Sequence, residues 1–174
     1  QKGLDLVNDV IPGVMDGNTQ VVVLGTGDSW YEEAFRSYEN QYKGSFCAYI
    51  AYDENVAHNI YSGCDALLVP SRFEPCGLTQ LIAMRYGAIP IVRETGGLRD
   101  TVWPYNMFDN TGNGFTFDRY ESGLLYDTIN RAKTCYFENR ASWDDMVIRD
   151  MNKDVSWETS ARQYKDMYVE LTPR

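Results

Sequence analysis

The sequence predicts an α/β protein built on a parallel β-sheet with helices on both faces. Short apolar runs alternate with segments of helical periodicity from the start of the chain to about residue 100, which is typical of β-α-β units. A cluster of glycine or polar residues follows each apolar run, where a strand would end. The length of 174 residues and the 44% apolar content fit one globular domain. We therefore expect residues 1–174 to fold as a single domain.

Alternating helices and strands fill the first hundred residues of this prediction. Helices are expected where apolar residues recur every three or four positions, and strands where a β-branched run such as QVVVL is closed by glycine. The expected order is helix 4–11, strand 20–24, helix 29–42, strand 46–51, short helix 55–62, strand 66–69, helix 78–86 and strand 89–92. The pair Pro12 and Gly13 is expected near the end of the first helix, because these residue types commonly terminate helices.

The remainder of the chain is predicted to be mainly helical. One last short strand is expected at 114–117, and apolar spacing marks helices at 124–132, 143–151 and 157–171. The polar break at 118–123 is too short for an interdomain linker. No second domain is therefore expected within these residues.

The composition excludes several kinds of partner and site. A net charge of −9 argues against nucleic acid as a partner. No stretch is long and apolar enough to cross a membrane, and no signal peptide is visible. The single histidine, His58, rules out a centre with several histidine ligands. The cysteines at 47, 64, 76 and 135 lack C-x-x-C spacing, so we expect reduced thiols rather than a zinc site or disulfides.

Ligands of open parallel sheets bind at the carboxyl ends of the strands, and four polar clusters fall at such ends. The first, GTGDSW at 25–30, has part of a dinucleotide fingerprint. It fails the full pattern because Trp30 occupies the third glycine position and Asp53 lies 28 residues on instead of about 20. A tight turn from strand to helix is the preferred interpretation, and close approach to a nucleotide is the alternative.

The motif EPCGLT at 74–79 carries the strongest indication of a ligand. Backbone amides at a helix start lack intrahelical partners and attract anions, and Gly77 allows the backbone to approach a ligand closely. Glu74 adds a carboxylate, which repels phosphate but accepts hydrogen bonds from sugar hydroxyls. The pattern favours a ligand with hydroxyls and phosphate side by side. A helix cap with an acidic neighbour is the alternative.

A second loop, ETGGLRDT at 94–101, repeats the arrangement after the next strand. Thr95, Gly96 and Gly97 place a hydroxyl and two glycines before a helix start. The loop alone is equally consistent with a turn, but adjacent strand ends share one edge of the sheet. Lys2 precedes another helix start and is either solvated or a ligand group, and Tyr52 at a strand end is either packed or a stacking platform.

Taken together, several stretches resemble one known family. The stretches QKGLD, GTGD, SRFEPCGLTQLIAMRYGAIPIV, TGGLRDTV, NGF and SW are similar to the C-terminal half of bacterial glycogen synthases and plant starch synthases, from Gln1 to about Leu171. These enzymes are retaining glucosyltransferases that use ADP-glucose. Their GT-B architecture has two Rossmann-like domains with the active site between them, and this chain resembles the second, donor-binding domain.

The resemblance implies a role for each matching residue. Lys2 would bind the donor phosphates and Glu74 the glucose hydroxyls, as the two catalytic positions. The implied substrate contacts are amides of Cys76 and Gly77 toward the sugar, amides of Leu78 and Thr79 on the distal phosphate, and Tyr52 on adenine. The loop of Thr95, Gly96 and Gly97 lines the same site. No metal or cofactor is expected.

The implied reaction moves glucose from ADP-glucose to the 4-hydroxyl at the end of an α-1,4-glucan, in a bacterial cytoplasm or a plant plastid. The N-terminal acceptor domain, and the first strand with its arginine, are absent from this sequence, so we expect a fragment that is inactive alone. The chain opens on QKGLDLV without an initiator methionine, which agrees with a fragment. The alternatives are another GT-B sugar-nucleotide transferase and a non-catalytic module that binds nucleotide sugar or glucan.

Overall fold

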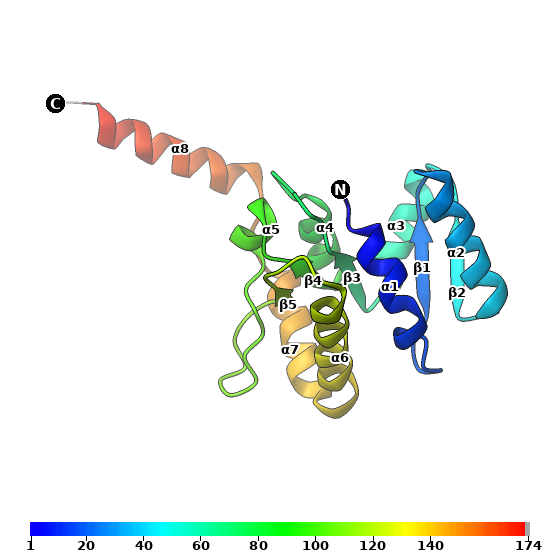
Figure 1. Cartoon of the computed structure of the whole chain (residues 1–174). Coiled ribbons are helices and arrows are strands. Elements are labelled where there is room, and N and C mark those ends of the chain that lie inside the picture. The colour runs from blue at the N-terminus through cyan, green and yellow to red at the C-terminus, as the bar shows by residue number, and fades with distance from the viewer. Residues whose placement is uncertain (173–174) are drawn as a thin grey trace.

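The computed structural model describes residues 1–172, which form alternating helices and strands (Figure 1). The strands are β1 (Val21–Leu24), β2 (Phe46–Tyr49), β3 (Ala66–Val69), β4 (Ile89–Arg93) and β5 (Phe115–Phe117). The helices are α1 (Leu4–Val14), α2 (Ser29–Gln41), α3 (Glu54–Gly63), α4 (Thr79–Tyr86), α5 (Gly96–Thr101), α6 (Ser122–Glu138), α7 (Arg140–Met151) and α8 (Trp157–Leu171). Each predicted element is present, with its ends shifted by a few residues in most cases.

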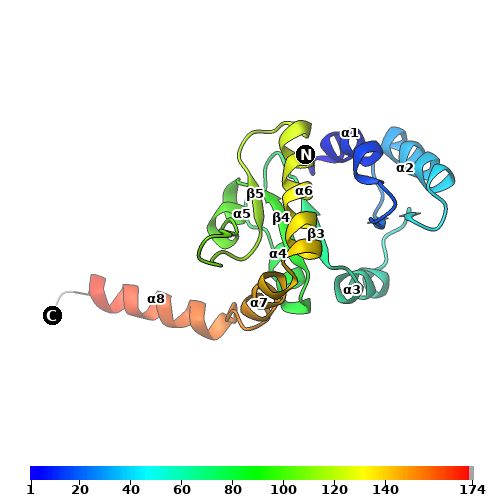
Figure 2. The same ribbon diagram turned by 90° about the horizontal axis from the view of Figure 1, so that it is seen from below.

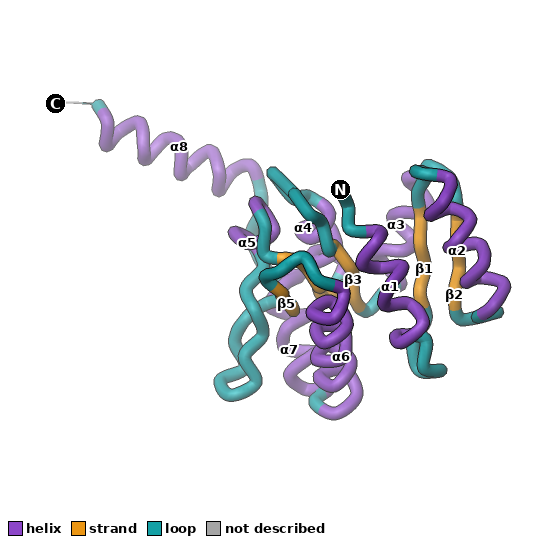
Figure 3. The backbone as a smooth tube through the Cα atoms, viewed as in Figure 1, coloured by secondary structure: helices purple, strands orange, loops and turns teal. Residues whose placement is uncertain are grey.

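The strands pair in parallel, as the alternating pattern predicted, but they form two sheets rather than one (Figure 3). One sheet joins β1 to β2, with Val21 opposite Phe46. The other has the order β3-β4-β5, with Ala66 opposite Ile89 and Ile91 opposite Phe115. Within residues 1–172 no strand lies between β1 and β3, so nothing bonds the two sheets into one.

Helices cover both faces of the three-stranded sheet, as predicted (Figure 2). On one face, Ile89, Ile91 and Phe115 pack in a buried cluster with α1, α6 and α7. On the other face, Val69 and Val92 pack with Met84 of α4, Leu98 of α5 and Val102, which directly follows α5. This alternation follows from the strand period of two, which sends neighbouring side chains to opposite faces.

Helix α1 connects the two sheets through its core side chains. Leu6 and Val10 belong to the cluster of the three-stranded sheet, whereas Val7 and Ile11 pack with Phe35, Phe46 and Ala48 near the two-stranded sheet. The helix was predicted over 4–11 with Pro12 and Gly13 near its end, and α1 instead continues to Val14 with both residues in its last turn. Proline cannot donate to the carbonyl four residues earlier, that of Asn8. The Tyr38 hydroxyl donates to this carbonyl at 3.1 Å and compensates for the missing bond.

Helix α8 leaves the body of the domain (Figures 1 and 2). None of its residues is buried, although its sequence has the amphipathic spacing that predicted it. The Ser156 hydroxyl caps its start by accepting from the Thr159 amide. The predicted helix therefore forms, but it adds nothing to the core of the domain.

Candidate functional site

Two of the predicted loops meet at the carboxyl ends of β3 and β4, and the start of the chain joins them. The Arg72 amide donates to the Gln1 carbonyl at 2.9 Å, which ties the first residues to the loop after β3. Gly3 permits this close passage, since its φ is +82° and a Cβ there would lie 2.2 Å from the Pro70 carbonyl oxygen. Lys2 is thereby placed beside the loop that carries Glu74.

Lys2 and Glu74, the two predicted catalytic positions, form an ion pair. The Lys2 Nζ lies 2.5 Å from Glu74 Oε2, and the Ser71 hydroxyl donates to the same oxygen at 3.0 Å. The Glu74 side chain is largely buried, whereas that of Lys2 is 63% exposed. The hydrogen bond from Lys2, opposed by burial and assisted by Ser71, lowers the pKa of Glu74. The carboxylate is therefore charged at neutral pH, and Glu74 Oε1 has no hydrogen-bond partner within residues 1–172.

The backbone after Glu74 presents a run of amides at the start of α4. The amides of Cys76, Gly77, Leu78 and Thr79 donate to no group in the described part of the chain. Gly77 has a φ of +72°, a left-handed conformation that glycine adopts without strain. Because the start of a helix also carries a partial positive charge, this segment is suited to an anion.

The loop after β4 packs directly on this segment. The Gly97 amide donates to the Glu74 carbonyl at 3.1 Å. A Cβ at Gly96 would lie 2.1 Å from that carbonyl oxygen, and one at Gly97 would lie 1.7 Å from the Cys76 carbonyl oxygen. Only glycine fits at these two positions. The expected meeting of the two loops is confirmed, and Thr95 precedes α5 as its N-cap residue.

Arg93 holds the loop after β3 in place through hydrogen bonds to its backbone, a role that was not predicted from the sequence. Its Nε donates to the Ser71 carbonyl at 2.9 Å, and other guanidinium nitrogens donate to the carbonyls of Arg72 and Asp118. Its position as the last residue of β4 was the only signal in the sequence. Ser71 was also missed as a partner of Glu74, although it stands three residues before it.

Tyr52 is not joined to the other predicted residues. It follows β2 of the two-stranded sheet and is 84% exposed. Its hydroxyl lies 3.4 Å from Glu54, and none of its hydrogen bonds in the described chain reaches the other predicted residues. His58 packs against Tyr86, with its Nδ1 3.0 Å from the Tyr86 hydroxyl, and thus has a structural contact. In the GTGDSW stretch, Asp28 accepts from the Trp30 amide and caps α2, as the turn interpretation expects.

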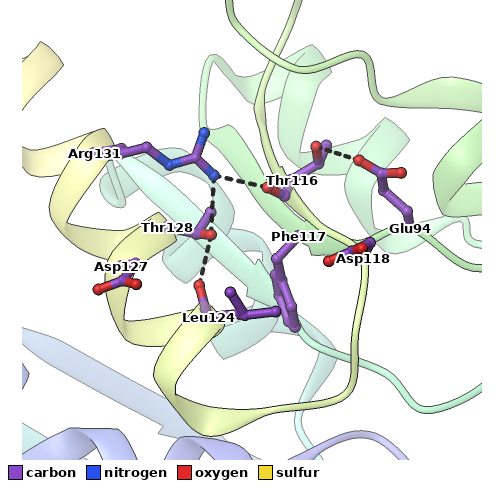
Figure 4. Close-up of a pocket in the computed structure, with 8 residues that line it drawn as sticks. All are labelled: Glu94, Thr116, Phe117, Asp118, Leu124, Asp127, Thr128 and Arg131. Carbon is purple, nitrogen blue, oxygen red and sulfur yellow. Dashed lines mark hydrogen bonds between the residues drawn. The ribbon is translucent and has the colours of Figure 1, made fainter.

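A separate polar hollow of about 590 Å³ lies between β5 and α6 (Figure 4). It is lined by Glu94, Thr116, Phe117, Asp118, Leu124, Asp127, Thr128 and Arg131. Its polar groups largely bond to one another. The Thr116 hydroxyl donates to Glu94 at 2.7 Å, and Arg131 donates to the Thr116 carbonyl at 2.8 Å. The hollow shares Glu94 with the start of the second loop.

Residues 1–172 contain neither a metal-binding cluster nor a membrane-spanning helix. No group of three or more His, Cys, Asp or Glu side chains is placed to hold a metal ion there. None of the helices in this range has the length and apolar character needed to cross a membrane.

The fold and the site together define an α/β protein with a run of unbonded backbone amides and a buried carboxylate at the ends of parallel strands. The chain belongs to the family described as Glycosyl transferases group 1, whose model matches residues 1–147. It is 48% identical over 171 residues to a glycogen synthase of Lachnoclostridium phytofermentans, covering 98% of this chain and 36% of that protein. It is 46% identical over 173 residues to the chloroplastic/amyloplastic soluble starch synthase 1 of Solanum tuberosum, covering 97% of this chain and 27% of that protein.

Solved structures agree with this assignment. The catalytic domain of Starch Synthase IV from Arabidopsis thaliana, bound to ADP and acarbose, matches with a TM-score of 0.86 and 36% identity, covering 98% of this chain and 36% of that chain. A sucrose-phosphate synthase from Thermosynechococcus elongatus, at 21% identity and a TM-score of 0.69, shares the fold and covers 98% of this chain and 42% of that chain. The predicted family and GT-B fold class are confirmed. The chain spans about a third of the length of the glycogen synthases it matches, 36% in the first case.

Proposed function

We propose that this chain is the donor-binding part of a retaining glucosyltransferase. The enzyme would move glucose from ADP-glucose to the non-reducing 4-hydroxyl end of an α-1,4-glucan, in glycogen or starch synthesis. The observation that carries the proposal is the convergence of Lys2, the buried Glu74 and the unbonded amides of residues 76–79 at one edge of the sheet. The glycogen and starch synthases among its relatives, and the ADP bound to the similar starch synthase structure, support it.

Lys2 and Glu74 would have two adjacent tasks. The Lys2 ammonium would bind the donor phosphates, while Glu74 would accept hydrogen bonds from glucose hydroxyls. Because these two groups lie 2.5 Å apart, phosphate and sugar would be held side by side. The amides of Cys76 and Gly77 would face the sugar, and those of Leu78 and Thr79 the distal phosphate. These amides have no competing partner within the described residues.

The chemistry that follows needs no protein nucleophile. The bond between glucose C1 and the phosphate oxygen breaks, and the glucan 4-oxygen bonds to C1 on the same face. The proton of that hydroxyl passes to the departing phosphate, and ADP leaves. Lys2 and the α4 amides would stabilise the charge that develops on the leaving group. We propose that no metal ion or cofactor takes part in this step.

The remaining parts of the proposal extend beyond these contacts. Tyr52 would stack on the adenine, and Thr95, Gly96 and Gly97 would form the second wall of the donor site. We propose that residues 1–174 form one domain, with the glucan bound by an N-terminal domain outside this sequence. A strand from that preceding part would fill the position between β1 and β3. The bacterial and plastid relatives suggest a bacterial cytoplasm or a plastid as the location.

The test is incorporation of labelled glucose into glycogen by the full-length protein, with ADP-glucose and UDP-glucose compared as donors. We expect transfer from ADP-glucose, and we expect Lys2→Ala to weaken ADP binding. A protein that binds ADP-glucose without transferring glucose would favour the second candidate, a non-catalytic binding module. For residues 1–174 alone, which cover 36% of a similar glycogen synthase, we expect weak binding of ADP or ADP-glucose at best and no glucose transfer.

A further inference from the structure

We propose that Gln80 is a positioning residue that locks the two donor loops together and orients the Leu78 amide toward the donor phosphate. The inference rests on the proposed function, because it takes the loops after β3 and β4 as the donor site. Gln80 was not among the predicted site residues. Its role follows from a chain of hydrogen bonds beneath the two loops.

Gln80 joins the loops from the buried side. It is the second residue of α4 and is 0% exposed. Its Nε2 donates to the Gly77 carbonyl at 2.5 Å and to the Thr101 hydroxyl at 2.9 Å. The Thr101 hydroxyl in turn donates to the Gly97 carbonyl at 2.6 Å. One buried amide therefore links Gly77, in the loop after β3, to both ends of α5.

The bond to Gly77 determines where the next amide points. The Gly77 carbonyl and the Leu78 amide belong to one planar trans peptide, so they point in opposite directions. Since the carbonyl is turned inward to Gln80, the Leu78 N–H is turned away from the buried amide. That N–H has no partner in the described part of the chain. Glycine leaves this peptide free to rotate, so the Gln80 bond supplies the restraint that Gly77 lacks.

The burial of Gln80 is costly, which argues against a purely structural explanation. Its Oε1 is buried and has no hydrogen-bond partner among the described residues. A buried amide with an unpaired oxygen is less stable than an apolar side chain of similar size. Met84, one turn later on α4, is 2% exposed and packs in an apolar cluster. An apolar residue at position 80 would fit the burial but would release the Gly77 carbonyl.

The experiment compares Gln80→Met with Met84→Ala in the full-length protein. For each we would measure the ADP dissociation constant by calorimetry, KM and kcat for ADP-glucose, and the Tm. We expect Gln80→Met to weaken ADP binding at least tenfold and to lower kcat/KM by a similar factor. Met84→Ala removes buried volume from the same helix, and the Met84 side chain makes none of the hydrogen bonds that join the two loops. We expect it to keep the ADP dissociation constant within twofold, even if its Tm falls as much.

A second variant provides an independent test should Gln80→Met fail to fold. Thr101→Val keeps the side-chain shape but removes the hydroxyl that bridges Gln80 to Gly97. We expect weaker ADP binding, and a double variant that binds no worse than Gln80→Met alone, because both changes break one network. Unchanged ADP affinity in either single variant, or an equal loss in Met84→Ala, overturns the inference. A wild-type protein that binds no ADP overturns the proposed function itself.

Discussion

Asp150 gives the structure a stability that depends on pH. It lies near the end of α7, is 2% exposed, and neither carboxylate oxygen has a hydrogen-bond partner in the described chain. Burial raises its pKa from 3.8 to about 7, although Lys153, Asn113 and Arg149 act in the opposite direction. Asp150→Asn removes the charge while keeping nearly the same shape. We therefore expect it to stabilise the domain wherever Asp150 would be ionised in the unfolded chain.

The sign and size follow from the two pKa values. Below pH 3.8 the carboxyl is protonated in both states, so its charge costs nothing. As pH rises toward about 7, the unfolded chain releases the proton and the folded domain retains it, so the free energy of unfolding falls. Each pH unit in this window changes that free energy by about 1.36 kcal/mol. The slope vanishes above the folded pKa, so from pH 5.5 to pH 8 the advantage of Asp150→Asn should grow by about 2 kcal/mol in total.

Urea unfolding of both proteins at pH 5.5 and pH 8 measures this difference. We expect Asp150→Asn to be more stable at pH 8 and its advantage to be smaller at pH 5.5. Asp127→Asn on α6 is the control, because it makes the same change from carboxylate to amide at an exposed position. An Asp150→Asn advantage that stays constant between the two pH values, or a destabilised variant at pH 8, would refute the reasoning.

Three further predictions concern the proposed donor site. Glu74→Ala in the full-length protein should reduce glucose transfer at least tenfold, since charge-assisted bonds to hydroxyls contribute roughly 1.5–3 kcal/mol each. The ADP dissociation constant should stay within about twofold. An equal loss of ADP affinity would contradict this role. Transfer by the full-length protein should survive a metal chelator, and a strict requirement for added magnesium would show that the phosphate charge is handled by an ion. Residues 1–174 alone should incorporate no measurable glucose into glycogen, with the full-length protein as the positive control.

The helices and strands could be predicted from the sequence because nearby residues largely determine where each of them forms. The run at 66–69 matches β3 at both ends, since an apolar segment closed by Pro70 has few other conformations. The last three residues of α1 were missed because the donor that compensates for Pro12, Tyr38, lies 30 residues from Asn8 in sequence. Proline signals a helix end only when no other part of the fold satisfies the carbonyl it leaves free.

The site could be predicted in part for the same reason. EPCGLT and TGGL follow neighbouring strands, so topology alone brings them together. The family resemblance put Lys2 and Glu74 in one site, but their direct ion pair, between residues 72 positions apart, was not predicted. The bond between Gln80 and Thr101 depends on how α4 and α5 pack, and a buried glutamine in an apolar helix gives little indication of its partner.

The division of the strands into two sheets could not be predicted from the periodicity of the sequence. A β-branched run has the same pattern whether its neighbour is present or not, so periodicity alone could not distinguish one sheet from two, and only the family resemblance indicated a missing first strand. Val21 of β1 packs against both the cluster of the three-stranded sheet and the cluster around Phe35, and α1 contributes side chains to both. In the view of Figure 1, α1 is drawn between the labels of β3 and β1. Packing thus holds the sheets in one body while backbone groups along the facing edges of β1 and β3 stay unpaired within residues 1–172. Such edges accept a further parallel strand readily, and a strand leading into Gln1 would end beside Lys2 at the carboxyl edge where the proposed donor is held.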